Sequence, residues 1–516
     1  MVLNFKVKKE IEIEKILGWV LFCFSLALGI VTLYIGVFDD EADNLVTGAF
    51  ITQGKILYKD VFTHHFPFTY YLMAFVVSIF GKSLFFSRLS VLLFQLVSLI
   101  WCAKLTKNYL PIGITSLIWS VLRVMYLGNM VLYNAFCAIS LLVVFILVLN
   151  AFVKRERLNF INIITIVVFS FIAIMSDPLA IYPIFVAGIF ITIDHFKAGV
   201  KIFFLGLGFV FFFLIFLIIT NSFQAFYSQA IHFNTAIYSK YVYTNPNRFL
   251  DIWKFIRTAF DLFNPVWWNF DIFRPITFNY TDFDRWFFTG GIYRIVSILI
   301  VLIYLLHKKF LSGLFVYLFL AATLVINPWG FRAQPFVLLA VFIISLFCSF
   351  EVWKSLKPRK VYQGVSILVL LIISGISLRV FTSIVHNFEK YNYKNNFSYI
   401  LELKDELNEL TCEQNNVLVG FYPSQLYFYW YTDYKFISKY TYLWPWVAEV
   451  ALDDILIDLK QPDINAIVIR KEMVVWDHYD TREYLKRLDE YLVANYINIE
   501  PGLYMSPNLE KNCESK

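Results

Sequence analysis

Residues 16–38 read ILGWVLFCFSLALGIVTLYIGVF, an apolar stretch without a single charged side chain, and residues 39–43 that follow read DDEAD. The stretch is long enough to cross about 30 Å of hydrocarbon and longer than the core of a signal peptide. Four lysines precede it between Met1 and Lys15. This basic flank predicts an uncleaved anchor with its N-terminus in the cytoplasm and its Asp39 end outside.

Similar apolar runs fill most of the first 380 residues. The chain has 516 residues, of which 59% are hydrophobic and only 16% charged, whereas about a quarter are charged in a soluble protein. We therefore expect an all-α polytopic membrane domain with about eleven transmembrane helices. The predicted spans are 16–38, 84–103, 110–127, 133–153, 160–176, 178–194, 201–220, 291–307, 309–327, 334–350 and 361–382.

One further apolar run, residues 67–80, decides the orientation of everything after it. If this run does not cross, five lysine-containing connectors fall on the cytoplasmic side, and the opposite short connectors contribute only Arg332. That asymmetry is the one that the positive-inside rule expects. The run is also too short to span comfortably, so we predict an interfacial helix.

With this orientation three large segments face outside: 39–83, the first outer loop; 221–290, rich in tryptophan; and 383–516. The last segment is soluble in composition, with predicted helices near 393–410 and 481–494 and strands at 417–422 and 466–470. The expected organisation is a transmembrane domain over 1–382 and a small C-terminal extracytoplasmic α/β domain over 383–516.

The distribution of charge bears on the class of function. The net charge of +6 is spread over short connectors between the predicted spans. This distribution is a signal of membrane topology and does not indicate a nucleic-acid partner. A transporter would keep ionisable groups near the midplane. Here the helix centres are nearly free of charge. The charged residues of the membrane domain lie at or near outward helix ends, and they are Arg88, Arg123, Asp177, Arg294 and Arg332.

Four carboxylates stand within residues 39–43, at the membrane surface directly after the first span. Asp39 or Asp40 can cap the start of a helix over 41–53, where acids also suit the helix dipole. Capping accounts for one or two of the acids. At least one carboxylate is left to act as a base or to bind a cation.

The first outer loop resembles that of the GT-C glycosyltransferases, and in particular their bacterial protein-mannosyltransferase-like and lipid A aminoarabinose-transferase-like branch. The landmarks cover about fifty residues in order: Asp40-Glu41-Ala42, Gly54-Lys55-Ile56-Leu57-Tyr58-Lys59-Asp60, His64-His65-Phe66-Pro67, Tyr70-Tyr71, Phe80-Gly81 and Ser87-Arg88-Leu89. The resemblance implies transmembrane helices with interfacial helices in this loop, and a polyprenyl-phosphate-linked sugar as donor.

The family's catalytic aspartate maps onto Asp40, with Glu41 in the following acidic position. Because Asp39 is acidic as well, an alignment shifted by one residue, with Asp39 as the catalytic aspartate, stays open. The sequence departs from many relatives at His64 and His65, where they carry an acid and then a lysine.

The expected mechanism needs a base for the acceptor hydroxyl and positive charge for the leaving lipid phosphate. We assign Asp40 as the base, and we expect the phosphate to be surrounded by Lys55, His64 or His65, Arg88 and Arg332. Arg332 is equally suited to anchoring at the interface, and Asp177 is most simply a helix start. A divalent cation on Asp40, Glu41 and Asp43 is conceivable, but no required metal or other cofactor is expected.

The predicted protein is thus a glycosyltransferase in a bacterial plasma membrane, acting on its outer face. The acceptor would be a cell-surface glycan, lipid or protein, and the resemblance implies inversion at the sugar carbon. Two alternatives stay open from the residues alone: a lipid-linked glycan transporter or flippase, and a non-catalytic scaffold that carries an extracytoplasmic domain.

Overall fold

The computed structural model describes residues 2–154, 157–242, 256, 310–326, 333–346, scattered positions from 364 to 386, 388–411 and 416–509. The predicted span 291–307 lies outside the described residues, as do most of 361–382 and the greater part of the predicted outer loop 221–290. The count of eleven spans therefore stays a prediction.

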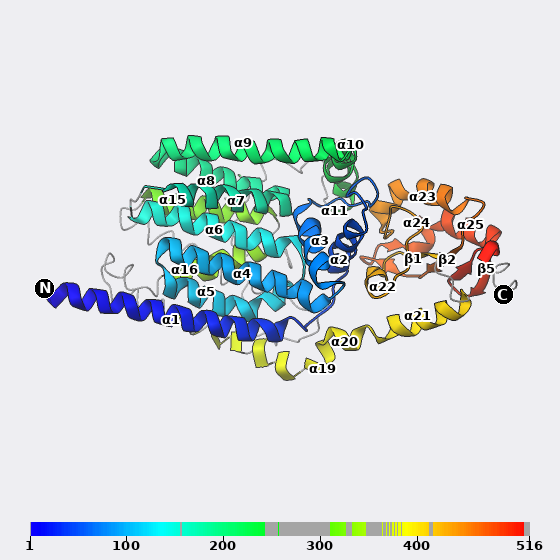
Figure 1. Cartoon of the computed structure of the whole chain (residues 1–516), viewed down its shortest axis with the longest axis horizontal. Coiled ribbons are helices and arrows are strands. Elements are labelled where there is room, and N and C mark those ends of the chain that lie inside the picture. Colours follow the sequence, from blue (N-terminus) through cyan, green and yellow to red (C-terminus); the bar gives the residue numbers. More distant parts are fainter. Residues whose placement is uncertain are drawn as a thin grey trace.

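Apolar helices form a bundle in which they run alongside one another (Figure 1). They fall where the sequence predicts spans: α1 (Val2–Thr32), α4 (Leu84–Thr106), α5 (Tyr109–Leu122), α6 (Tyr133–Lys154), α7 (Phe160–Ser176), α8 (Ile181–Asp194), α9 (Phe196–Ile219), α15 (Phe310–Ile326) and α16 (Gln334–Leu346). In the described part of the chain, five helices are long and apolar enough to cross a membrane: Glu12–Thr32, Leu84–Thr106, Tyr109–Tyr126, Tyr133–Val153 and Phe196–Ile219.

The first helix ends at Thr32, six residues before the predicted end at 38, because buried side chains take over its last carbonyl groups. The last carbonyls of a helix have no partner within it. Arg123 donates to the Gly29 carbonyl at 2.8 Å, and Asn129 donates to the carbonyls of Thr32 and Ile35 at 2.9 and 2.8 Å. These bonds fix the point at which the chain leaves the bundle.

Two helices of the first outer loop, α2 (Asp39–Thr52) and α3 (Phe68–Phe80), lie at one end of the bundle (Figure 1). They approach closely at Gly48, where an added Cβ atom would stand 2.6 Å from Met73 Cβ. Figure 1 shows both helices between the bundle and the part of the chain that carries the strands. The helix expected at 67–80 is present as α3, and its position at the membrane interface stays a prediction.

The C-terminal part contains a four-stranded sheet in the order β1-β2-β6-β5. β1 (Leu418–Tyr422) and β2 (Ala466–Arg470) are parallel, whereas β6 (Leu503–Met505) is antiparallel to β2 and to β5 (Ile497–Glu500). Both parallel strands lie where the sequence predicts strands, because residues that favour strands dominate them: valine, phenylalanine and tyrosine in β1, isoleucine and valine in β2. Helices flank them: α21 (Ser398–Leu410), α22 (Leu426–Tyr431), α23 (Pro445–Leu459), α24 (Thr481–Tyr484) and α25 (Lys486–Asn495).

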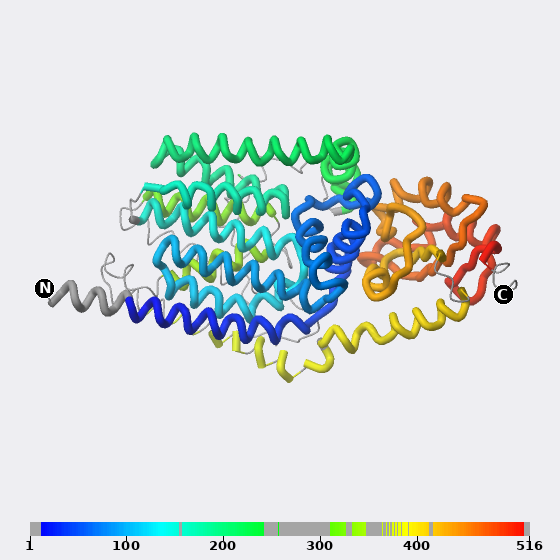
Figure 2. The backbone as a smooth tube through the Cα atoms, viewed as in Figure 1, coloured from blue at the N-terminus to red at the C-terminus, as the bar shows by residue number. Residues whose placement is uncertain are grey.

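The C-terminal part shares one hydrophobic core with the first outer loop. The rings of Phe50 in α2 and Phe436 lie edge to face with centroids 4.3 Å apart. Figure 2 shows the connecting segment, α19 (Phe388–Tyr391), α20 (Tyr393–Asn396) and α21, running along the outside of the molecule from the bundle to the strands. The start of α2 is consequently enclosed between the bundle and the C-terminal part.

Candidate functional site

A cavity of about 330 Å³ lies at the start of α2, and three carboxylates line it: Asp39, Asp40 and Asp43. Residues three apart on a helix share a face, so Asp40 and Asp43 both reach the cavity while Glu41 points elsewhere. The density of negative charge is high because three acidic side chains lie within two turns of α2. The cavity is therefore suited to accepting protons and hydrogen bonds from hydroxyl groups.

Asp43 is the most deeply placed of these acids, with only 5% of its surface exposed. Tyr70 donates a hydrogen bond to Asp43 Oδ2 at 2.7 Å, and Thr63 contacts the Tyr70 hydroxyl at 2.5 Å. Burial raises the pKa of Asp43 to about 7; the bond from Tyr70 opposes this rise, and the nearby charge of Asp40 adds to it. Asp43 can thus exchange a proton near neutral pH.

His64 and His65 stand beside the carboxylates in the same cavity. Their ring centroids are 4.0 Å apart, and His65 stacks on Tyr133 at 4.6 Å. His64 Nδ1 lies 3.2 Å from the hydroxyl of Tyr442, which comes from the C-terminal part. The two histidines bring ionisable nitrogens into the site from the loop between α2 and α3.

A π-helix, η3 (Tyr227–Tyr238), holds this loop in place. Gln229 donates to the Tyr58 carbonyl at 2.5 Å and accepts from the Thr63 amide at 3.1 Å. Asn234 donates to the His64 carbonyl at 2.6 Å. The backbone that leads up to His64, and His64 itself, is thereby fixed by a segment that begins the predicted outer loop 221–290.

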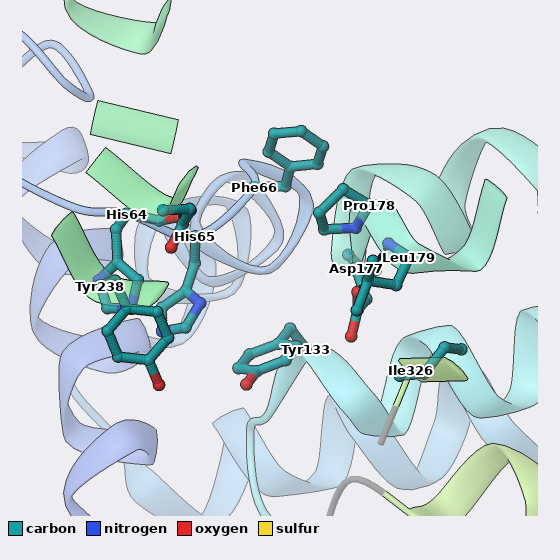
Figure 3. A pocket seen from close by; sticks show the side chains of 11 residues that line it. His64, His65, Phe66, Tyr133, Asp177, Pro178, Leu179, Tyr238 and Ile326 are labelled. Atoms are coloured by element: carbon teal, nitrogen blue, oxygen red, sulfur yellow. Dashed lines mark hydrogen bonds between the residues drawn. The ribbon is translucent and has the colours of Figure 1, made fainter. Parts of the chain in front are cut away.

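A smaller cavity of about 60 Å³ lies on the bundle side of the histidines. Figure 3 shows His64, His65 and Tyr238 on one side of it and Asp177, Pro178 and Leu179 on the other. Asp177 is 7% exposed and accepts a hydrogen bond from the Leu179 amide at 2.9 Å, as a helix start predicts. The histidine pair therefore separates a cavity among helix ends from the larger cavity that faces the C-terminal part.

Glu41 and Arg88 have other roles than the predicted ones, since both are fully buried and bound to each other. The five N–H groups of Arg88 are matched by five bonds, two to Glu41 and one each to the carbonyls of Leu33, Ile35 and Gly36. No donor remains for a phosphate. This corrects the expectation that Arg88 binds the donor.

Glu41 is saturated in the same way. Its Oε1 accepts from Arg88 and from the Val131 amide at 2.9 Å, and its Oε2 accepts from Arg88 and from the Tyr427 hydroxyl at 2.8 Å. The carboxylate does not line the cavity. Glu41 therefore joins the first loop to the bundle and to the C-terminal part, and the prediction of a catalytic role for it is corrected.

Two further residues were predicted to bind the phosphate, Lys55 and Arg332. Lys55 is exposed and is absent from the residues that line the large cavity, and Arg332 lies outside the described residues. Within the described ranges, no group of three histidine, cysteine or acidic side chains is placed to hold a metal ion. Of the predicted site residues, the structure brings together Asp40, His64 and His65.

Several residues of the cavity wall were not predicted as site residues. Asp43 was visible in the acidic run, but its burial was not. The remaining wall comes from distant segments, with no local signal in the sequence: Tyr238, Leu426, Tyr442, Trp444, Trp446, Met473, Val474, Val475 and Trp476.

No protein-family model and no curated protein matches this sequence. Among solved structures the chain is similar to ArnT from Cupriavidus metallidurans in the apo state, at 12% identity and a TM-score of 0.48, over 95% of this chain and 97% of that one. It is likewise similar to ArnT bound to undecaprenyl phosphate, at 13% identity and a TM-score of 0.48, over 95% and 98%. ArnT is the lipid A aminoarabinose transferase, of the branch that the first outer loop resembles, and a likeness of this size carries no residue's role over to this chain.

Proposed function

We propose that this protein is a membrane glycosyltransferase that moves a sugar from a polyprenyl-phosphate carrier to an acceptor on the extracytoplasmic face. The observation that carries the proposal is the cavity at the end of the apolar bundle, where Asp40 and Asp43 face His64 and His65. A water-excluded acid with a pKa near 7 beside ionisable imidazoles is an arrangement suited to proton transfer.

In the proposed reaction the acceptor oxygen attacks the anomeric carbon of the sugar. The bond from that carbon to the phosphate oxygen breaks, and its electron pair leaves with the lipid phosphate. The acceptor's proton passes to Asp40. Direct displacement of this kind inverts the anomeric carbon.

Asp43 acts beside Asp40 as a second carboxyl group. Because it holds a proton up to about pH 7, it limits the negative charge next to Asp40. When it ionises, its charge makes Asp40 a stronger base, since each carboxylate disfavours the ionisation of the other. We therefore assign Asp40 the proton abstraction and Asp43 the tuning of that step.

The histidines are placed to meet the departing phosphate. They separate the small cavity among the helix ends from the larger one, so a carrier that enters from the bilayer would reach them from the bundle side. His64 is oriented by Tyr442 and by the bond from Asn234 to its carbonyl. Protonated imidazole would offset the charge that develops on the phosphate.

The test is release of radiolabelled sugar from polyprenyl-phosphate donors by the full-length protein in lipid vesicles. ArnT has been solved with undecaprenyl phosphate, so donors on that carrier are assayed first. Asp40→Asn should lower turnover by about 10²-fold or more, the scale of a lost general base. Asp405→Asn is the matched control, because Asp405 is exposed on α21 and does not line the cavity.

Full activity in a folded Asp40→Asn protein contradicts the assigned base. Translocation of an intact donor across the same vesicles, without cleavage of its sugar-phosphate bond, would instead establish a transporter.

A further inference from the structure

The large cavity that the carboxylates line is also lined by an exposed tryptophan on a hairpin of the C-terminal part. Trp476 lies in the turn between β3 (Val474–Val475) and β4 (Tyr479–Asp480), and 50% of its surface is exposed. A ring of this size in contact with water is costly unless something covers it.

The backbone at Trp476 has a φ of +52°, in the left-handed region that bulky residues rarely adopt. Asp477 follows with a φ of +57°. Asparagine or glycine would suit position 476 better. The turn is held firmly in spite of this, because Met473 and Thr481 exchange two hydrogen bonds of 3.0 Å across the base of the hairpin.

Other aromatic rings support Trp476 from one side. Its ring centroid lies 4.5 Å from that of Trp446, tilted by 32°, and Trp444 lies 6.2 Å from Trp446. All three rings line the cavity that also holds Asp39, Asp40 and Asp43. Trp476 is thus fixed by a neighbouring ring while half of its surface stays uncovered.

The Trp446 side chain offers a donor as well. Its Nε1 atom is buried, and within the described part of the chain no hydrogen-bond acceptor is matched to it. A buried N–H without a partner costs free energy that a ligand can recover by accepting from it. The cavity wall therefore combines an exposed aromatic ring, an N–H donor without a partner and three carboxylate groups that can accept hydrogen bonds.

We propose that Trp444, Trp446 and Trp476 form an acceptor subsite that binds a pyranose ring, so that the acceptor is a glycan. A sugar ring presents polarised C–H groups on one face, which pack on the electron-rich face of an indole. Its hydroxyl groups accept from Trp446 Nε1 and donate to the carboxylates across the cavity. An extended peptide offers no comparable flat face with hydroxyl groups around its edge.

The position of the subsite assigns it to the acceptor and not to the donor. In the proposed function the carrier-linked sugar approaches from the bundle side of His64 and His65, whereas the tryptophans belong to the C-terminal part. An acceptor stacked there would have a hydroxyl directed at Asp40. This assignment rests on the proposed function, but glycan binding itself does not require transfer and can be measured alone.

The experiment is binding of oligosaccharides to the full-length protein in nanodiscs of zwitterionic lipid. The probes are tetramers of glucose, galactose, mannose and N-acetylglucosamine, with a serine- and threonine-rich peptide as comparison. We expect at least one oligosaccharide to bind, and Trp476→Asn to weaken its binding about tenfold, the scale of one aromatic stacking contact.

Two variants separate recognition from folding. Trp476→Asn suits the left-handed backbone, so its melting temperature should not fall. Trp476→Tyr keeps a ring and should retain most of the affinity. Ile457→Ala is the control, since it removes an exposed apolar side chain of α23 away from the cavity.

Wild-type protein that binds the peptide but none of the oligosaccharides overturns the proposal, as does a Trp476→Asn variant that binds them as well as wild type. Glycan binding that depends on Trp476 in a protein without donor turnover would uphold the subsite and reject the transferase. Donor turnover with no glycan binding would uphold the transferase and reject the subsite.

Discussion

Arg88 and Glu41 form a fully buried ion pair that joins α4 to α2, with Arg88 Nε 2.9 Å from Glu41 Oε1 and Nη2 2.5 Å from Oε2. The remaining N–H groups of Arg88 go to carbonyls just beyond α1. One side chain therefore fixes the end of the first span and the start of the first outer loop together. Removing either partner leaves the other charge buried without compensation.

We expect Arg88→Met to lower the free energy of unfolding by about 3 to 5 kcal/mol, and Glu41→Gln to weaken it in the same direction. The measurement is the apparent melting temperature in detergent. Glu490→Gln is the control, because its pair with Lys486 is exposed and worth at most about 1 kcal/mol. Wild-type stability in Arg88→Met would refute the structural role assigned to the pair.

The pKa of Asp43 predicts how stability changes with pH. Because burial raises that pKa to about 7, the folded state keeps a proton that the unfolded state releases above about pH 4. Wild-type stability should therefore fall from pH 4 to 7 and level off above pH 7.

Asp43→Asn removes this dependence because asparagine stays neutral and can still accept from Tyr70. Its advantage over wild type should grow with pH and approach about 4 kcal/mol above pH 7. Melting temperatures at pH 4, 6 and 8 measure the effect, with Asp405→Asn as the control. An advantage that shrinks as the pH rises would show that Asp43 is stabilised as an anion.

Gly48 should tolerate no side chain, since an added Cβ atom would meet Met73 Cβ at 2.6 Å and the Ala74 amide nitrogen at 3.0 Å. We expect Gly48→Ala to separate α2 from α3 and to cost about 1 to 3 kcal/mol, the range for overpacking. Gly188→Ala is matched to it, because Gly188 lies in α8 with open space around it. Melting temperatures compare the two, and equal values for both variants would argue against the close approach.

Gln229 should matter for activity although it does not line the large cavity. Gln229→Leu leaves the Tyr58 carbonyl and the Thr63 amide without their partner, at a cost of about 1 to 3 kcal/mol each. We expect the loop that carries His64 to shift. The KM for the donor should then rise severalfold, while kcat stays unchanged.

The control for this prediction is Gln224→Leu, because Gln224 is exposed on α10 (Phe223–Phe226). Both variants are assayed for KM and kcat with the same donor. Unaltered kinetics in a folded Gln229→Leu protein would mean that η3 does not position the histidines.

Much of the fold could be predicted because its signals are local. Each apolar run of bilayer length became a helix where the structure describes it, and the strands at 418–422 and 466–470 coincide with runs of β-branched and aromatic residues. The early end of α1 could not be predicted. Apolar residues continue to Phe38, and the helix stops where Arg123 and Asn129, far along the chain, take its carbonyls.

The candidate site was predicted in part for the same reason. Asp40, His64 and His65 belong to one loop of the sequence, and the structure places them at one cavity. Arginine suits phosphate binding and glutamate suits catalysis, which is why Arg88 and Glu41 were predicted as site residues. The residue type does not reveal whether the charged group already has a partner. Their pairing depends on how α2 and α4 pack, which only the tertiary structure decides.

The sequence by itself determined that this chain forms apolar helices, that acids follow the first span, and that a soluble part comes last, because composition and spacing act locally. Tertiary structure alone decided that Asp43 is buried, that Arg88 forms an ion pair with Glu41, and that Trp476 lines the same cavity as Asp40. The physical reason is that burial, pairing and enclosure depend on contacts between segments that are not neighbours in the sequence.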